Sequence, residues 1–234
     1  MSAANLVIIP CYNEKENIRR LIETLLSLYE NIEILIVDDN SPDGTADEVR
    51  NAFDQVDRVH LMVRDKKDGR GGAVLDGIAW ALEEKTYDRI VEMDADFSHE
   101  PKELSALLEA SSNADVIIGS RYLLESSIQN WPLRRRIFSK IANLYARTLL
   151  RIPISDYTNG YRLYSKKAAA SIERNAIKSK GYIVLSAIAY QLHRSGFTFA
   201  EVPTVFVNRD RGVSNLSISE LWDAFSGIIK IRLK

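Results

Sequence analysis

Two aspartates separated by one residue, Asp94 and Asp96, are the residues whose types and spacing most clearly suggest chemistry. They follow the apolar run 90–93, which predicts a buried strand. Side chains two positions apart on an extended backbone point the same way, so both carboxylates can converge beyond the strand end. Such hard oxygens suit Mg²⁺ or Mn²⁺, which often complete their coordination with substrate phosphates. A lone Asp-x-Asp is more often a turn, so this prediction depends on the neighbouring motifs.

Short apolar runs alternate with amphipathic helical patterns on both sides of these aspartates. We predict strands at 6–9, 33–37, 59–63, 89–93 and 116–118, and helices at 14–28, 45–53, 72–84 and 101–110. This alternation predicts an α/β fold with a mostly parallel central sheet flanked by helices. Ligands of such sheets bind beyond the carboxyl ends of the strands. The polar clusters lie at those ends, at 10–14, 38–41, 69–72, 94–96 and 120–122.

The pattern changes after Tyr122. We predict a long basic helix over 131–150, a loop over 156–162, helices over 166–175 and 182–195, a strand over 201–207 and a last helix over 219–234. The helix from Trp131 carries Ile137, Ile141 and Leu144 on one stripe with basic residues around it. This pattern, repeated in the last helix, is typical of helices at a membrane surface. A helix packed on the domain with a solvated basic face explains it equally well.

Composition excludes several classes of protein. The formal net charge of −1 over 234 residues, without aromatic stacking motifs, argues against a nucleic-acid binder. The single cysteine, Cys11, excludes a disulfide framework and fits a cytoplasmic protein. No leader pattern or membrane-spanning apolar run occurs in this sequence. We therefore expect a peripheral protein on the cytoplasmic face of a membrane, with a membrane-anchoring partner protein as a further option.

The order and spacing of six motifs resemble those of inverting glycosyltransferases of family 2, and especially their dolichyl- and polyprenyl-phosphate mannose synthase branch. The motifs lie at 10–14, 37–45, 93–99, 119–122, 159–164 and 179–182, so the resemblance covers nearly the whole chain. It implies a GT-A-type domain, a nucleotide-sugar donor, a divalent metal and a dolichyl or polyprenyl phosphate acceptor. GDP-mannose is the expected donor.

Carried over by position, the resemblance gives the motif residues expected roles. Asp94 and Asp96 are expected metal ligands. Asp156 and Arg162 are candidates for positioning the acceptor phosphate, with a surface ion pair as the alternative for Arg162. The expected catalytic residues are Asp96, Arg121, Asp156 and Arg162. The expected nucleotide-sugar-binding residues are Pro10, Tyr12, Glu14, Val37, Asp39, Asp94, Ala95, Arg121, Arg209 and Asn215.

Two departures from the family leave the donor open. The stretch 182–187 lacks a glutamate that the family carries, and the family's Ser-Lys pair appears here as Ser214 and Asn215. A UDP-sugar, such as UDP-glucose or UDP-N-acetylglucosamine, is therefore the alternative donor. The alternative to an enzyme is a non-catalytic subunit that binds a nucleotide sugar within a membrane complex. We expect a GT-A-like domain over 1–215 and a C-terminal amphipathic helix over 216–234.

Overall fold

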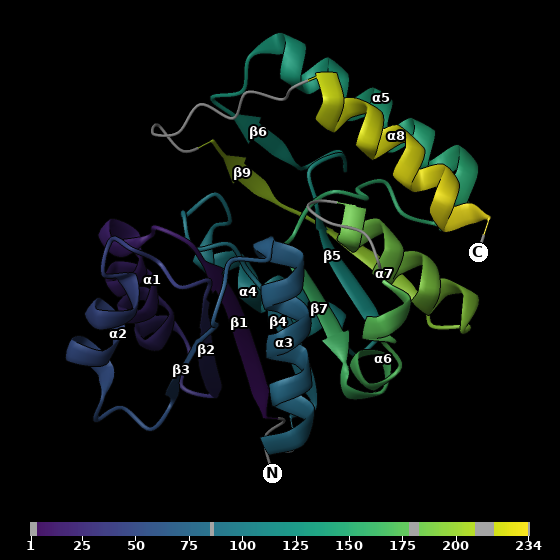
Figure 1. The fold of residues 1–234 in the computed structure, drawn as a ribbon. Helices are drawn as coiled ribbons and strands as arrows, with labels where there is room; N and C mark the ends of the chain where they lie inside the picture. The colour runs from purple at the N-terminus through teal and green to yellow at the C-terminus, as the bar shows by residue number, and fades with distance from the viewer. Residues whose placement is uncertain (1–3, 85–86, 178–182, 209–217, 234) are drawn as a thin grey trace.

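A seven-stranded sheet forms the centre of the molecule (Figure 1). The computed structural model describes residues 4–84, 87–177, 183–208 and 218–233. The sheet has the strand order β3-β2-β1-β4-β7-β5-β8, and β7 runs opposite to its neighbours and to the rest. Its strands are β1 (Asn5–Cys11), β2 (Ile32–Asp38), β3 (Val59–Val63), β4 (Arg89–Glu92), β5 (Val116–Ser120), β7 (Arg162–Ser165) and β8 (Phe199–Pro203). The predicted α/β fold with a mostly parallel sheet is confirmed.

Helices cover both faces of this sheet, as Figure 1 shows for α3 in front of it. The helices are α1 (Lys15–Leu28), α2 (Thr45–Phe53), α3 (Gly69–Glu84), α4 (Leu104–Ala110), α5 (Leu133–Leu150), α6 (Lys166–Ala170), α7 (Ile183–Arg194) and α8 (Ile218–Arg232), with short 3₁₀ turns η1 (Pro101–Glu103) and η2 (Arg174–Ala176). Side chains of α1, α2 and α4 pack in one apolar cluster, and those of α3, α6 and α7 in the other.

The alternation of side chains along β1 explains why both faces are covered. Leu6 and Ile8 belong to the cluster beneath α3, whereas Val7 and Ile9 belong to the cluster beneath α1. All four side chains are fully buried. A strand with apolar residues on both faces needs a layer on each side, as in other parallel sheets.

The reversed strand β7 sets the shape of the sheet's carboxyl edge. Its first residue, Arg162, pairs with Glu92 of β4 and Ile118 of β5, near the carboxyl ends of those strands. The chain before β7 must therefore cross this edge between β4 and β5. The motif 156–161 is brought to the edge in this way.

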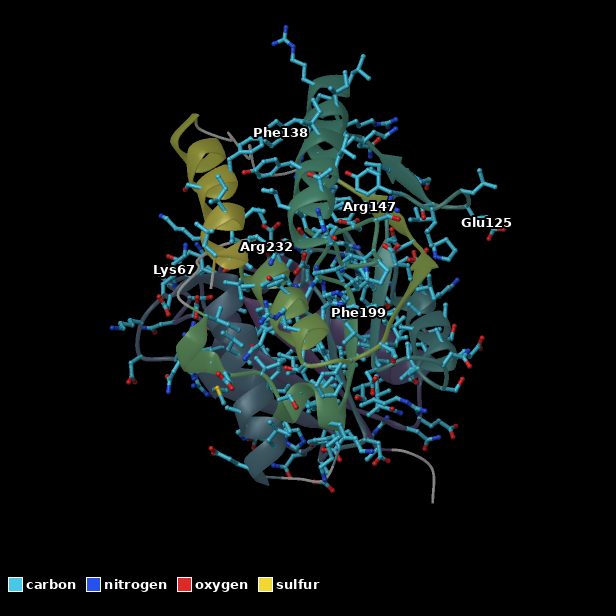
Figure 2. All side chains as sticks on the ribbon, turned by 90° about the vertical axis from the view of Figure 1, so that its right-hand side faces the viewer. Lys67, Glu125, Phe138, Arg147, Phe199 and Arg232 are labelled. Atoms are coloured by element: carbon cyan, nitrogen blue, oxygen red, sulfur yellow. The ribbon has the colours of Figure 1, made fainter. Side chains whose placement is uncertain are left out.

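Two long helices, α5 and α8, lie side by side beyond this edge (Figure 1). Figure 2 shows Phe138 between them, where its ring meets that of Phe225 at 6.5 Å. The hydroxyl of Tyr145 also donates to the carbonyl of Phe225 at 3.2 Å. A small second sheet, β6 (Ser127–Gln129) with β9 (Val205–Val207), lies next to the start of α5. Within the described ranges, no helix is long and apolar enough to cross a membrane.

Several sequence-based boundaries were wrong. Strands β6 and β7 were not predicted, and the strand predicted at 201–207 is divided into β8 and β9 at Thr204. The helix predicted from residue 72 begins at Gly69, and the one predicted over 166–175 is the shorter α6. The predicted domain boundary at 215–216 lies outside the described residues.

Candidate active site

The loop after β1 is held by the loop after β2. The backbone N–H groups of residues 13, 14 and 15 donate to Ser41 Oγ at 3.0 Å, Thr45 Oγ1 at 3.0 Å and Asp43 Oδ2 at 3.1 Å. Asp38 in turn accepts hydrogen bonds from the backbone N–H and the hydroxyl of Ser41. The polar residues of the 37–45 motif therefore fix the position of the 10–14 motif, and Asp38 binds neighbouring backbone.

Tyr12 and Glu14 lie on this loop at the sheet's carboxyl edge, after Pro10 near the end of β1. Tyr12 is 37% exposed, and Lys67 Nζ lies 3.5 Å from the centre of its ring. Glu14 Oε2 accepts from Asn17 Nδ2 at 2.9 Å in the first turn of α1. The structure brings these residues to the expected edge; their contact with a nucleotide stays a prediction.

Asp39 is buried at the end of β2 and bound on both sides. Its Oδ1 accepts from Arg64, and its Oδ2 accepts from the backbone N–H of Gly69 at 2.9 Å. The N-terminus of α3 thus binds a carboxylate of the protein itself. The side chain of Val37, next to the end of β2, lies fully buried in the core, so its contact with a nucleotide would have to come from its backbone and stays a prediction.

The Asp94–Asp96 turn has a tightly defined backbone. The N–H of Asp94 donates to His99 Nδ1 at 3.2 Å, and Asp96 Oδ1 accepts from the N–H of Ser98 at 3.0 Å. Phe97 has a φ of 56°, a left-handed conformation that is rare for a bulky side chain and concentrates at functional sites. Ala95, by contrast, is buried and contributes only its backbone to this turn.

A buried histidine connects this turn to the loop before β7. His99 Nε2 lies 2.9 Å from Asn159 Oδ1, and its ring stacks on Tyr161 with centroids 4.9 Å apart. Because Nδ1 accepts from Asp94, Nε2 must carry the hydrogen that Asn159 accepts. Asn159 also donates through Nδ2 to the carbonyl of Gly119, near the end of β5. This geometry gives His99 a structural role between the turn and the loop.

Arg121 and Asp156 form a buried ion pair at the end of β5. Arg121 Nε and Nη2 lie 2.7 and 2.8 Å from the two carboxylate oxygens of Asp156, and Nη2 also donates to Thr158 at 2.7 Å. Burial alone would raise the pKa of the Asp156 carboxyl, but the charge and hydrogen bonds of Arg121 outweigh this and lower it. The pair is thus preorganised as a fixed positive and negative charge.

Arg162 requires a correction. The residue was a candidate for positioning the acceptor phosphate, with a surface ion pair as the alternative, but its side chain is fully buried. Its nitrogens donate to the backbone carbonyls of Asn159, Leu185 and Tyr157 at 2.7–2.9 Å. Arg162 therefore shapes the loop before β7 from within, rather than facing a ligand.

The residues at the end of β4 fit a metal that shares its coordination with a substrate. Among the described residues, no three His, Cys, Asp or Glu side chains are grouped as a complete metal site. Asp94 and Asp96 form a two-carboxylate set, which suits Mg²⁺ or Mn²⁺ completed by water and phosphate oxygens. Arg209 and Asn215, also expected near the donor, lie outside the described residues.

Sequence reasoning missed two arginines at this edge. Arg64 binds Asp39, and Arg70 Nε binds Asp94 Oδ1 at 2.6 Å. The glycine-rich segment 69–72 was the available signal for Arg64, because a Cβ added to Gly72 would lie 2.9 Å from Arg64 Nη2.

Solved structures share this fold at low sequence identity. The glucosyl-3-phosphoglycerate synthase of Mycobacterium tuberculosis, crystallised with Mn²⁺, UDP and glucosyl-3-phosphoglycerate, superposes with a TM-score of 0.70 and 17% identity over 99% of this chain and 79% of that chain. A second structure of that enzyme, with Mn²⁺, UDP and phosphoglyceric acid, gives a TM-score of 0.71 at 17% identity, covering 99% of this chain and 78% of that chain. These similarities concern the fold alone.

Sequence comparison gives closer relatives. The polyprenol monophosphomannose synthase of Mycolicibacterium smegmatis is 45% identical over 223 residues, covering 94% of this chain and 83% of the relative. The undecaprenyl-phosphate mannosyltransferase of Micrococcus luteus is 41% identical over 212 residues, covering 91% of this chain and 87% of the relative. The family model for glycosyl transferase family 2 matches residues 6–172. The chain therefore belongs to glycosyltransferase family 2.

Proposed function

We propose that this protein is a metal-dependent, inverting hexosyltransferase that moves mannose from GDP-mannose to a polyprenyl phosphate such as dolichyl phosphate. The observation that carries the proposal is the identity of 45% and 41%, over more than nine-tenths of the chain, to two enzymes named for mannosyl transfer to polyprenyl carriers.

The charges at the sheet's carboxyl edge support this reaction. Asp94 and Asp96 would hold Mg²⁺ or Mn²⁺. The M. tuberculosis enzyme, which has a similar fold, was crystallised with Mn²⁺ and UDP. Such a cation neutralises charge on a departing diphosphate. Asp39 and Tyr12 lie on the β1–β2 side of the edge, where we expect the nucleoside.

The proposed reaction needs no general base from the protein. An oxygen of the acceptor phosphate, already anionic at neutral pH, attacks the anomeric carbon of the sugar. The bond from that carbon to the diphosphate breaks, and its electron pair leaves with the nucleoside diphosphate. The residues of the protein therefore act by holding the phosphates and neutralising their charge. We assign this role to Arg121, which is ion-paired with Asp156.

A UDP-sugar remains the second candidate donor, favoured by Asn215 and by the absence of a glutamate at 182–187. The test is calorimetric titration with GDP and UDP in Mg²⁺, followed by transfer from GDP-mannose and UDP-sugars to a short polyprenyl phosphate. We expect GDP binding and mannose transfer. Tight UDP binding without GDP binding would contradict GDP-mannose as the donor. It would not contradict the transfer of a sugar to a polyprenyl phosphate. Nucleotide binding without transfer from any donor would favour the non-catalytic subunit.

The metal assignment predicts that Asp96→Asn loses activity without unfolding. Removing one charged contact to the transition state typically lowers the rate by about 10²–10³-fold. Transfer assays should show this loss, and EDTA should abolish wild-type activity. Glu125→Gln, which neutralises an exposed carboxylate elsewhere, is the control (Figure 2). Full activity in EDTA would exclude the metal.

The ion pair predicts a stability change with a defined pH dependence. Asp156→Asn leaves Arg121 as an uncompensated buried charge, so the free energy of unfolding should fall by about 3–5 kcal/mol at pH 7 in urea titrations. Thr158→Val removes one hydrogen bond to Arg121 and should cost only about 1 kcal/mol. Because the pKa of Asp156 is lowered by folding, its contribution is present above the unfolded pKa of about 3.9 and is lost as the pH falls further. Equal stability of the Asp156→Asn variant and wild type at pH 7 would contradict this.

We further propose that α5 lies on a membrane surface, on the cytoplasmic side. Four apolar side chains form a stripe along this helix: Leu133, Ile137, Ile141 and Leu144, each between 50% and 71% exposed. Exposed basic residues lie on both sides of the stripe, namely Arg134, Arg136, Lys140 and Arg147, and α5 contains no acidic residue. An exposed apolar stripe with basic flanks suits an anionic lipid surface.

Vesicle binding tests this surface. Arg135 and Arg136 are bound to Asn208 and to the carbonyl of Ile128, so the variant changes Arg134, Lys140 and Arg147 to Ser instead. Each basic residue contributes about 1 kcal/mol near an anionic surface, so sedimentation with phosphatidylglycerol vesicles should fall by at least tenfold at low salt. The control changes Lys102, Lys166 and Lys167 to Ser, which removes the same charge from other exposed surfaces. Equal vesicle binding of both triple variants would exclude α5 as the membrane-binding surface. If the wild-type protein does not bind vesicles, a partner protein that anchors it to the membrane is favoured.

A further inference from the structure

Arg70, in the first turn of α3, connects three separate parts of the candidate active site. Its Nε lies 2.6 Å from Asp94 Oδ1, and its Nη1 lies 2.9 Å from Glu92 Oε2. Its Nη2 donates to the carbonyl of Gly160 at 2.9 Å. A single guanidinium thus binds the end of β4, the residue at the start of the Asp94–Asp96 turn, and the loop before β7.

The residues around Arg70 are adapted to this guanidinium. A Cβ added to Gly160 would lie 2.1 Å from Arg70 Nη2, so the loop approaches it closely only with glycine at this position. Glu92 is 1% exposed and accepts a second hydrogen bond from the Tyr164 hydroxyl at 2.7 Å. Burial alone would lower the pKa of Arg70, but Asp94 and Glu92 outweigh it, so the group stays charged.

The position of this charge matters for a metal at Asp94 and Asp96. Glu92, Asp94 and Asp96 bring three negative charges to one strand end, and Arg70 offsets one of them. A fixed cation beside Asp94 disfavours a second cation there by simple Coulomb repulsion. The three carboxylates, Arg70 and a divalent cation together sum to zero charge. A nucleoside diphosphate adds negative charge beside them, which attracts the cation more strongly.

We propose that Arg70 is a positioning residue that fixes the Asp94 carboxylate and weakens metal binding until a nucleoside diphosphate is present. This rests on the proposed function, because it takes Asp94 and Asp96 as the metal ligands. Arg70 does not contact the reacting atoms in this scheme. Its effect is a coupling between metal and diphosphate, so that each binds more tightly in the presence of the other.

Manganese binding tests the proposal without an activity assay. Free Mn²⁺ is measured by electron paramagnetic resonance, with and without GDP and with and without UDP. Arg70→Met alone would strand the buried carboxylate of Glu92, so the main variant combines Arg70→Met with Glu92→Gln, and Glu92→Gln alone is the matched control. Without nucleotide, the double variant should bind Mn²⁺ about tenfold more tightly than Glu92→Gln, and the tightening produced by the nucleotide should shrink by the same factor.

Arg70→Lys separates the charge from the geometry. Lysine keeps the positive charge but cannot form the three-branched set of contacts. We expect the coupling between Mn²⁺ and nucleotide to persist, while kcat falls because Asp94 is no longer held. If the double variant and Glu92→Gln bind Mn²⁺ equally tightly without nucleotide, the proposed role of Arg70 is wrong. The metal in the proposed function is not affected by that result. If wild-type protein binds no Mn²⁺ with either nucleotide, the metal in the proposed function fails as well.

Discussion

A short path of hydrogen bonds between the ends of β4 and β5 holds the candidate active site together. It runs from the backbone of Asp94 through His99 to Asn159, whose own N–H donates to Asp156, the partner of Arg121. This path exists because β7 runs against its neighbours and begins at the carboxyl edge. A parallel strand in that position would end there and would send the 156–161 loop elsewhere.

The same path explains why a charged site can be built in the interior. Each buried polar group along it has a defined partner, so little rearrangement is needed when phosphate charge arrives. Arg162 supports the path from beneath by binding the carbonyls of Tyr157 and Asn159. A buried arginine is costly unless its N–H groups are hydrogen-bonded, and three backbone carbonyls accept from Arg162.

The sequence predicted the elements of the β–α repeat up to β5 with boundaries within three residues, because apolar period and turn residues are local signals. It missed β7, since four residues that pair on both sides with distant strands carry no local pattern of their own. The same limit applies to side chains. Asp94 and Arg121 were identified by their motifs, whereas Arg70 binds partners 22, 24 and 90 residues away along the chain. Arg162 was misplaced because charge suggests a surface position, and only the tertiary structure supplies the three carbonyls that bury it.

Trp131 links the site to the helix with the exposed stripe. Its ring lies 5.3 Å from the guanidinium carbon of Arg121 and packs against Phe206, while Arg135 of α5 lies over it at 4.2 Å. The start of α5 is therefore fixed to the same cluster that holds Arg121. A change in the position of the start of α5 would therefore also change the packing around Arg121.

The place of β7 in the sheet also has a consequence for folding. Strands β4 and β5 flank β7 but precede it in the chain, so they cannot both be joined to the sheet until residues 162–165 are available. During synthesis, the first half of the chain would emerge with the edge of β4 unpaired. Closing this gap requires long-range contacts, which form slowly and leave an open strand edge exposed in the meantime. Assembly of the candidate active site should thus be among the last events in folding. A chain that ends before residue 165 would lack the pairing of β7 with β4 and β5, and with it the arrangement of the candidate active site.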